Sequence, residues 1–508
     1  MSLKKQILKG TLILTAAGFI TRILGLYNRV FLANLISAAQ LGLYQLIFPV
    51  LSVCMAVCCY GIESAMSKMI AAQSAGRCHE NMMRTVRIGV SLSLGLSILL
   101  CIAVGGGSQW IAGVLLRESE CEPYLRIMAL VLPFSTMHSC ILGYFFGSQK
   151  TGVPAASQLL EQIVRVGTIY ILSVTVYSSR RADASLAISG LLAGEVVSCI
   201  FTVISYKMTA YITEKRYRAK SFCIPAKGYG ILLRQLWQLA YPLTVNRLAL
   251  TLLQSLEAVL IPAMLKIFYG TSETALEIYG VAMGMAFPFI MFPMTLTNAL
   301  STMLLPAVSK ASEEKDYDAI GRTVSKSVQY CLMIGILSMT VFYVYGNVLG
   351  IVIFKNQTAG YFLKMFALLC PLMYCSSALS STLNGLGKVR MTLVHSVLSL
   401  GVRIGFILLA VPKLGVTGYL WGMLAGYMLL VILNGRKVIQ LAGLYVNLWK
   451  AVIIPCIFAV LAAMASLAVY QFIIHYMILP VLMVAVICCF SLCIVYVSAL
   501  GICGCLKL

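Results

Sequence analysis

The residues best suited to chemistry are ionisable side chains that lie inside long apolar segments of the sequence. A charged side chain at the centre of a membrane helix costs about 2.5 to 3.5 kcal/mol, so it usually faces a partner or a water-filled cavity. The set comprises Arg22, Arg29, Arg165, Arg247, Arg403, Glu63, Glu161, Glu195 and Glu257. We therefore expect these residues to bind an anion, to couple to an ion gradient, or to neutralise one another.

Two of the arginines occur in GFITRILGLYNRVFLANLI, residues 18 to 36. Arg22 and Arg29 are seven residues apart, a spacing that places both on one face of an α-helix, with Asn28 beside them. They could extend to a headgroup region or pair with glutamates elsewhere. Arg22 lies about a dozen residues into its segment, which is deep for that role, so the spacing favours a water-filled cavity that binds an anion.

Glu161 and Arg165 are spaced i, i+4, as in an intrahelical ion pair that would neutralise both charges. A functional role is an equally good interpretation of this pair. Arg403 has Ser399 at the corresponding place four residues earlier. The charge of Arg403 is therefore either more exposed than that of Arg165 or paired with Glu195 or Glu257 from another helix.

The remaining ionisable residues each have a structural and a functional interpretation. Arg247 follows Asn246 near the end of its segment and could anchor the helix at the membrane surface or contact the substrate. Glu63 is within reach of Lys68, which suggests a local pair. Alternatively, coupling to H⁺, Na⁺ or the membrane potential could use Glu63, Glu161, Glu195 and Glu257.

The segments that carry these residues are membrane helices. The chain has 508 residues, 60% hydrophobic and 11% charged, whereas a globular domain holds about a quarter charged residues. About 14 apolar runs are each long enough to cross roughly 30 Å of hydrocarbon as a helix. We place them at 10–34, 42–70, 86–107, 123–147, 153–177, 184–207, 236–267, 276–308, 325–350, 360–385, 391–412, 415–438, 449–473 and 477–502. The predicted fold is an all-α polytopic membrane protein.

The net charge of +22 is distributed so that it indicates the orientation of the chain in the membrane and not a nucleic-acid partner. Most Lys and Arg residues lie in loops on one predicted side, notably 207–234 and 310–326, so both termini are expected in the cytoplasm. The sequence contains no phosphate-binding loop of the G-x-x-x-x-G-K-[ST] type and no H-E-x-x-H or C-x-x-C motif. We expect no metal site, no cofactor and no enzymatic activity.

An internal repeat organises the chain. The segment YLRIMALVLPFSTMHSCILGYFFGSQK (124–150) aligns without a gap with FLKMFALLCPLMYCSSALSSTLNGLGK (362–388). This repeat alignment places Pro133 on Pro371 and continues in the same register to Arg165 on Arg403. Six spans per copy is an even number, so we expect a 6+6 parallel repeat related by an axis along the membrane normal. The predicted parts are an N-lobe at 1–207, a basic cytoplasmic linker at 208–230, a C-lobe at 231–440 and two extra helices at 441–508.

The segments LILTAAGFITRILGLYNRVFLANLISAAQLGLYQLIFPV (12–50) and GIESAMSKMIAA (61–72) resemble the opening of the stage V sporulation protein B and polysaccharide-biosynthesis family. That family belongs to the multidrug/oligosaccharidyl-lipid/polysaccharide exporter superfamily and is related to lipid II flippases. Thr21, Arg22 and Gly25 match the arginine motif in the first helix of lipid II flippases, while Asn28 takes the place nearest the second arginine and Arg29 follows.

The resemblance implies a MATE-like fold with alternating access and a substrate of the undecaprenyl-pyrophosphate-linked saccharide class. It implies that the cavity arginines, Arg22 and Arg29 first, bind the pyrophosphate, and that the two extra helices accompany the lipid tail. We expect a monomer in the bacterial cytoplasmic membrane that works beside cell-wall synthesis enzymes. The alternatives are a cation-coupled multidrug antiporter and a non-transporting regulator of cell-wall or spore-cortex synthesis.

Overall fold

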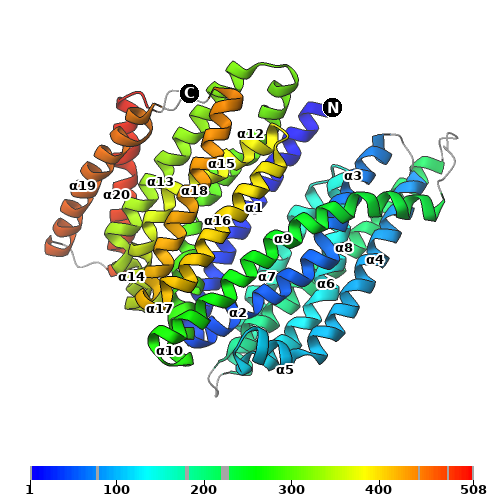
Figure 1. The fold of residues 1–508 in the computed structure, drawn as a ribbon, viewed down its shortest axis with the longest axis horizontal. Coiled ribbons are helices and arrows are strands. Elements are labelled where there is room, and N and C mark those ends of the chain that lie inside the picture. Colours follow the sequence, from blue (N-terminus) through cyan, green and yellow to red (C-terminus); the bar gives the residue numbers. More distant parts are fainter. Residues whose placement is uncertain are drawn as a thin grey trace. The chain divides into compact units, whose positions relative to one another are not determined.

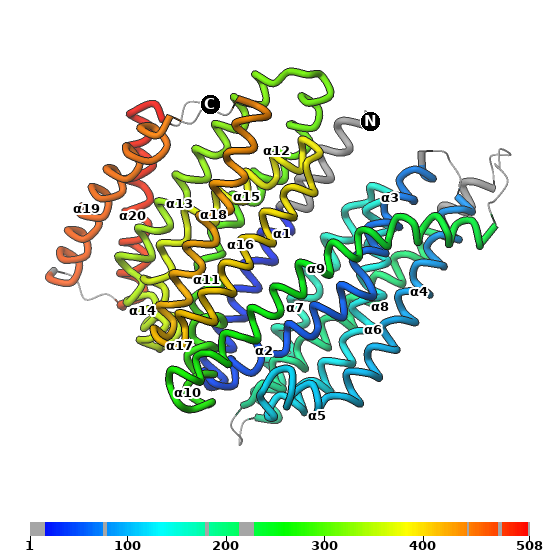
Figure 2. Tube along the Cα trace, in the orientation of Figure 1, coloured from blue at the N-terminus to red at the C-terminus, as the bar shows by residue number. Residues whose placement is uncertain are grey.

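The computed structural model describes residues 3–75, 79–177, 182–218, 228–443, 447–476 and 480–505 (Figures 1 and 2). Within these ranges it describes the side chains from residue 16 onward, apart from those of residues 75, 213–218 and 476. The chain divides into two compact units, Met1–Val259 and Leu260–Leu508. Helices make up both units, and the described residues outside them form turns, short connections and one isolated bridge between Ile36 and Ala182.

Unit 1 contains the helices from the N-terminus through most of α9. Its long elements are α1 (Leu3–Leu35), α2 (Ala38–Met55), α3 (Gly61–Ala75), α4 (His79–Gly106), α6 (Glu122–Gly147), α7 (Gly152–Thr175), α8 (Ala184–Arg218) and α9 (Tyr229–Tyr269). Its short elements are η1 (Ala56–Tyr60), α5 (Ser108–Trp110), η2 (Ile111–Leu115) and η3 (Ser119–Cys121). The π-helical η1 joins α2 to α3 without a loop, so the two form one continuous span.

Unit 2 repeats this order and adds a helix pair. Its long elements are α12 (Met294–Glu313), α13 (Tyr317–Phe354), α15 (Cys370–Gly385), α16 (Val389–Leu409), α18 (Val416–Ala442), α19 (Ile454–Tyr476) and α20 (Val481–Ile502). Its short elements are α10 (Ser272–Tyr279), η4 (Gly280–Ala286), α11 (Phe287–Met291), α14 (Gln357–Phe366), η5 (Ala367–Leu369), α17 (Val411–Leu414) and η6 (Trp449–Ile453).

Polar side chains mark several helix starts. Ser37, Thr271, Asp316 and Asn356 each accept a hydrogen bond from the backbone N–H three residues later. Such a cap satisfies a donor that the first turn of a helix leaves unpaired. These caps fix where α2, α10, α13 and α14 begin.

The predicted internal repeat agrees with the packing inside each unit. In unit 1, Gly147 of α6 lies so close to α3 that a Cβ there would be 2.5 Å from the carbonyl oxygen of Ser67. In unit 2, a Cβ on Gly385 of α15 would be 2.8 Å from the carbonyl oxygen of Leu305 of α12. The repeat alignment places Gly147 on Gly385 and, in the same register, Ser67 on Leu305. The same helix contact is therefore built twice.

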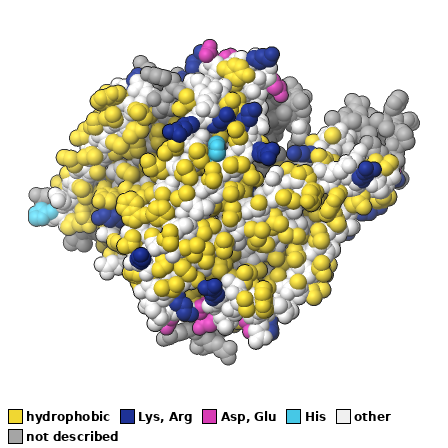
Figure 3. All heavy atoms as spheres, viewed as in Figure 1, with side chains coloured by type: hydrophobic (Ala, Val, Ile, Leu, Met, Phe, Trp, Pro, Cys, Tyr) yellow, Lys and Arg dark blue, Asp and Glu magenta, His cyan; other side chains and the backbone are white. Residues whose placement is uncertain are grey.

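The protein is a multi-pass membrane protein. Twelve helices among the described residues are long and apolar enough to span a membrane, and hydrophobic side chains cover most of the face in Figure 3. The predicted count of 14 is not confirmed, because the predicted spans 10–34 and 153–177 are not among the twelve. These two segments are α1 and α7. In α7 the ionisable residues Glu161 and Arg165 lower the mean hydropathy. For α1, the side chains are described only from residue 16 onward, so only part of the predicted span 10–34 has described side chains.

The two extra helices of the C-terminal segment pack against α13 of unit 2. The Tyr345 hydroxyl shares a hydrogen bond with Ser466 of α19 (2.5 Å), and the Tyr496 hydroxyl of α20 donates to the carbonyl oxygen of Met333 (3.0 Å). The predicted linker 208–230 falls partly outside the described residues, and α8 continues through its first part to Arg218. The predicted lobe boundaries stay a prediction.

Candidate functional site

The first helix of unit 1 packs along α7. A Cβ on Gly25 would lie 3.9 Å from Oε1 of Gln162, and the rings of Phe31 and Tyr170 are 6.3 Å apart. Gly25 and the residues three and four positions later share one face of the helix. This packing brings the arginine-bearing part of α1 toward the middle of α7.

Arg29 is exposed and lies close enough to Arg165 for the two charges to repel, while the buried hydroxyl of Tyr44 on α2 interacts with both. No carboxylate among the described side chains lies within ion-pair distance of Arg29. Asn28 is buried, and its Oδ1 has no hydrogen-bond partner in the described structure. Arg22 is also exposed, about two turns toward the N-terminus. Two guanidinium groups close to one tyrosine hydroxyl are a ready arrangement for an anion.

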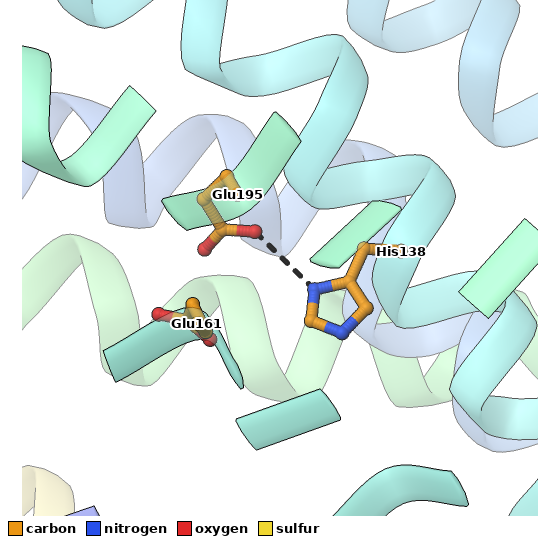
Figure 4. Close-up of side chains that lie close together, drawn as sticks. All are labelled: His138, Glu161 and Glu195. Atoms are coloured by element: carbon orange, nitrogen blue, oxygen red, sulfur yellow. Dashed lines mark hydrogen bonds and ion pairs between the residues drawn. The ribbon is translucent and has the colours of Figure 1, made fainter. Parts of the chain in front are cut away.

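A buried histidine lies at the centre of a second polar cluster in unit 1. His138 of α6 is 4% exposed; its Nδ1 is 3.3 Å from Oε2 of Glu195 on α8, and its Nε2 is 2.7 Å from Oγ of Ser157 on α7 (Figure 4). One ligand atom from each of His138, Glu161 and Glu195 lies within 4.8 Å of the others. We call His138, Glu161, Glu195 and Arg165 the N-unit network.

Arg165 joins the N-unit network to α1. Its guanidinium forms the predicted i, i+4 ion pair with Glu161 on α7, in which both side chains are about five-sixths buried. The backbone of α8 approaches this pair closely, since a Cβ on Gly194 would be 2.9 Å from the carbonyl oxygen of Glu161. A glycine there allows the carboxylate of Glu195, one residue later, to reach His138.

The convergence of an imidazole and two carboxylates is also a donor set that suits a metal ion. Here the donors are engaged within the protein. His138 is bonded on both ring nitrogens, and Glu161 already faces the guanidinium of Arg165. The cation of this cluster is therefore an arginine, and we interpret the cluster as a hydrogen-bonded ionic network.

Glu63 belongs near this network. It is half-buried on α3 and lies close enough to His138 for their charges to interact. No ion pair joins Glu63 to Lys68 among the described residues, so the expected local pair does not form. Three carboxylates, those of Glu63, Glu161 and Glu195, thus surround one histidine.

The other predicted site residues lie apart from this cluster. Arg247 of α9 is exposed and stacks over the ring of Tyr60, with its Cζ 5.0 Å from the ring centroid. Glu257 of α9 is 5% exposed and also has an interaction partner. Arg403 of α16, in unit 2, stacks over Tyr427 at 5.3 Å.

Unit 2 preserves the arginine of the network and lacks its acids. In the register of the repeat alignment, Ser301, Ser376 and Ser399 stand in the places of Glu63, His138 and Glu161. Gly426 approaches Ser399 and Arg403 as Gly194 approaches Glu161 and Arg165, so Tyr427 takes the place of Glu195. The guanidinium group of Arg403 stacks on the ring of Tyr427, whereas the guanidinium group of Arg165 pairs with the carboxylate of Glu161.

Sequence reasoning missed the central role of His138. The histidines of the chain looked scattered, because the neighbours of His138 come from α7 and α8 and are distant in sequence. The available signal was the combination of Glu161 and Glu195 in consecutive spans with a histidine in the span before them. The structure brings together Glu63, Glu161, Glu195, Arg165 and Arg29, and places Arg403 in the other unit.

Comparison with protein families identifies two matches. The profile of the polysaccharide biosynthesis protein family matches residues 7–268, and the MatE profile matches residues 249–409. Stage V sporulation protein B of Bacillus subtilis (strain 168) is 27% identical over 462 residues, which cover 89% of this chain and 88% of that protein. Lipid II flippase MurJ of the same organism is 20% identical and covers 65% of this chain and 63% of its own length.

Solved structures have the same fold. Lipid II flippase MurJ in an inward closed conformation superposes with a TM-score of 0.72 at 14% identity, covering 97% of this chain and 98% of that chain. A multidrug resistance MATE family transporter in an inward-facing conformation superposes with a TM-score of 0.60 at 13% identity, covering 83% and 95%. The MATE-like fold expected from the sequence is therefore confirmed.

Proposed function

Because the chain belongs to the polysaccharide biosynthesis protein family, we propose that it is a flippase for a lipid-linked saccharide. The substrate class is an undecaprenyl-pyrophosphate-linked sugar, such as a peptidoglycan precursor or another unit of a cell-envelope polysaccharide. The protein would work by alternating access in the bacterial cytoplasmic membrane, as a monomer with both termini in the cytoplasm. The relatives named for sporulation and for lipid II transport support this class.

One observation carries the proposal: an exposed arginine of α1, Arg29, lies close to a second arginine, Arg165 of α7, and the hydroxyl of Tyr44 on α2 interacts with both. A pyrophosphate offers several anionic oxygens and would bridge guanidinium groups that otherwise repel. Arg22, on the same helix, would extend the site. Arg247 of unit 1, which stacks on the ring of Tyr60, is assigned as a secondary contact for the sugar or the phosphate. Arg403 of unit 2, which stacks on Tyr427, stays a predicted substrate contact of its own unit.

The test is transport of a labelled undecaprenyl-pyrophosphate saccharide in proteoliposomes, measured by accessibility of the sugar on each side. Arg29→Ala removes a charge-assisted contact worth about 1.5 to 3 kcal/mol, so transport should fall roughly 10- to 150-fold. Arg22→Ala should also reduce it. Arg322→Ala, which removes an exposed arginine of α13, is the matched control and should transport normally. Normal transport by both α1 variants would refute the assignment.

A cation-coupled multidrug antiporter is the second candidate, favoured by the MatE match and by the buried acids of unit 1. It predicts efflux of a cationic dye from proteoliposomes under an imposed H⁺ or Na⁺ gradient. Dye efflux that needs Glu161 and Glu195, together with no movement of any lipid-linked saccharide, would favour this alternative. A non-transporting regulator would show neither activity.

A further inference from the structure

The N-unit network has more negative than positive charge. It holds the carboxylates of Glu161 and Glu195 against the one guanidinium group of Arg165. With its neighbours Glu63 and Arg29 included, there are three carboxylates around His138 and two guanidinium groups. An uncompensated charge in the interior of a membrane protein is costly, so such a cluster tends to hold a cation. A proton on the histidine or on a carboxylate is the smallest cation that restores the balance.

Arg165 has two competing sets of partners. On its own helix it pairs with Glu161, and toward α1 it faces Arg29 and Tyr44. An anion that bound Arg29 would attract Arg165 away from Glu161. The Glu161 carboxylate would then lie within 4.8 Å of the Glu195 carboxylate and His138 with no guanidinium to neutralise it.

We propose that the N-unit network is a proton-binding site that takes up a proton when an anionic pyrophosphate engages Arg29 and Arg165. The proton comes from water and forms an O–H bond on Glu161, while no bond of the substrate changes. This inference rests on the proposed function, because it assumes that the anion binds at these arginines. It couples binding of the anion to uptake of a proton.

Every element that packs around His138 contributes to the charge that the proton meets. α3 provides Glu63, α7 provides Glu161 and Arg165, and α8 provides Glu195. The π-helical η1 adds the thiol of Cys59, which interacts with Glu63, and α8 adds the thiol of Cys199, which interacts with Glu195. Tyr44 of α2 interacts with Arg165. A bound anion makes the surroundings of Glu161 and His138 more negative, so binding and proton uptake reinforce each other.

The sign of the coupling separates this inference from an antiport scheme. In antiport, a proton and the substrate compete, so substrate binding releases a proton. Here substrate binding takes up as many as one proton, so the affinity for the anion should fall by up to tenfold for each unit rise in pH. Unit 2 offers the contrast, because Arg403 lies there beside Ser399 and Tyr427 and no acid of this network recurs.

The experiment is calorimetric titration of the full-length protein in nanodiscs with undecaprenyl pyrophosphate, in two buffers of different ionisation enthalpy at pH 7. The difference in observed heat gives the number of protons taken up. We expect uptake by the wild-type protein, and binding with little or no uptake by Glu161→Gln. Glu277→Gln, an exposed acid of unit 2, should behave as the wild type. Undecaprenol, which lacks the pyrophosphate, should cause no uptake.

The outcomes distinguish the two proposals. Binding of undecaprenyl pyrophosphate with no proton uptake, or with proton release, would overturn the inference and leave the proposed function standing. No binding of undecaprenyl pyrophosphate by the wild-type protein would overturn both. Unchanged uptake in both Glu161→Gln and Glu195→Gln would also overturn the inference; size-exclusion profiles would establish that these conservative variants are folded.

Discussion

Arg165 and Glu161 depend on each other because each is largely buried. Arg165→Ala leaves the Glu161 and Glu195 carboxylates close together without their guanidinium, and removal of one partner of a buried ion pair costs about 3 to 5 kcal/mol. We expect a clear drop in the thermal unfolding midpoint of the detergent-solubilised protein. The double variant Arg165→Ala/Glu161→Gln should recover much of that loss. A double variant no more stable than Arg165→Ala would show that the pair contributes little.

For individual residues, the sequence predicted the ion pair within one helix and missed the side-chain contacts between helices. The i, i+4 spacing of Glu161 and Arg165 fixes their neighbourhood as soon as α7 is a helix. Sequence reasoning gave no partner for His138, because Glu195 reaches it only through the close approach of α8 at Gly194. Contacts of that kind depend on tertiary packing, which periodicity does not specify.

Close helix packing in both units relies on glycine at repeated positions. Gly147→Ala would place a methyl group against the carbonyl oxygen of Ser67, and overpacking of this kind typically costs about 1 to 3 kcal/mol. We expect reduced thermal stability for Gly147→Ala and for its equivalent Gly385→Ala. Gly152→Ala is the control, because nothing lies within 4 Å of a Cβ there. Equal stability of all three variants would contradict this account of the α3–α6 and α12–α15 contacts.

Most helices lie where hydrophobic runs of the right length predicted them. The breaks within spans were not predicted, since η1 and η4 change the hydrogen-bond pattern without changing the hydrophobic pattern. The polar composition of α7 lowers its hydropathy below that of the other predicted spans, although its 24 residues form one helix. Glu161 and Arg165 make α7 unlike a plain membrane segment, because these ionisable residues offset its apolar ones.

Across the whole molecule, duplication gave two similar units and later substitution made them chemically different. The arginine of α7 recurs in α16, while the acids and the histidine around it are replaced by serines and a tyrosine. The internal repeat could be predicted from the sequence, because whole segments align without a gap. The asymmetry of the buried network emerged only when packing showed which residues surround each arginine. One unit surrounds its arginine with acids and the other with serines and an aromatic ring, so the two units divide the ionisable groups unequally.

That division predicts a pH dependence that belongs to unit 1 alone. If substrate binding takes up a proton at the N-unit network, flipping at low substrate concentration should slow as pH rises from 6 to 8, by up to roughly tenfold per unit. Glu161→Gln carries a neutral side chain at every pH, so its rate should vary much less. Ser399→Ala changes the equivalent position of unit 2 and should keep the wild-type profile. The measurement is the initial rate of lipid-linked saccharide flipping in proteoliposomes buffered equally on both sides. A steeper profile for Ser399→Ala than for Glu161→Gln would locate the titrating groups in unit 1, whereas equal profiles for all three proteins would place them elsewhere.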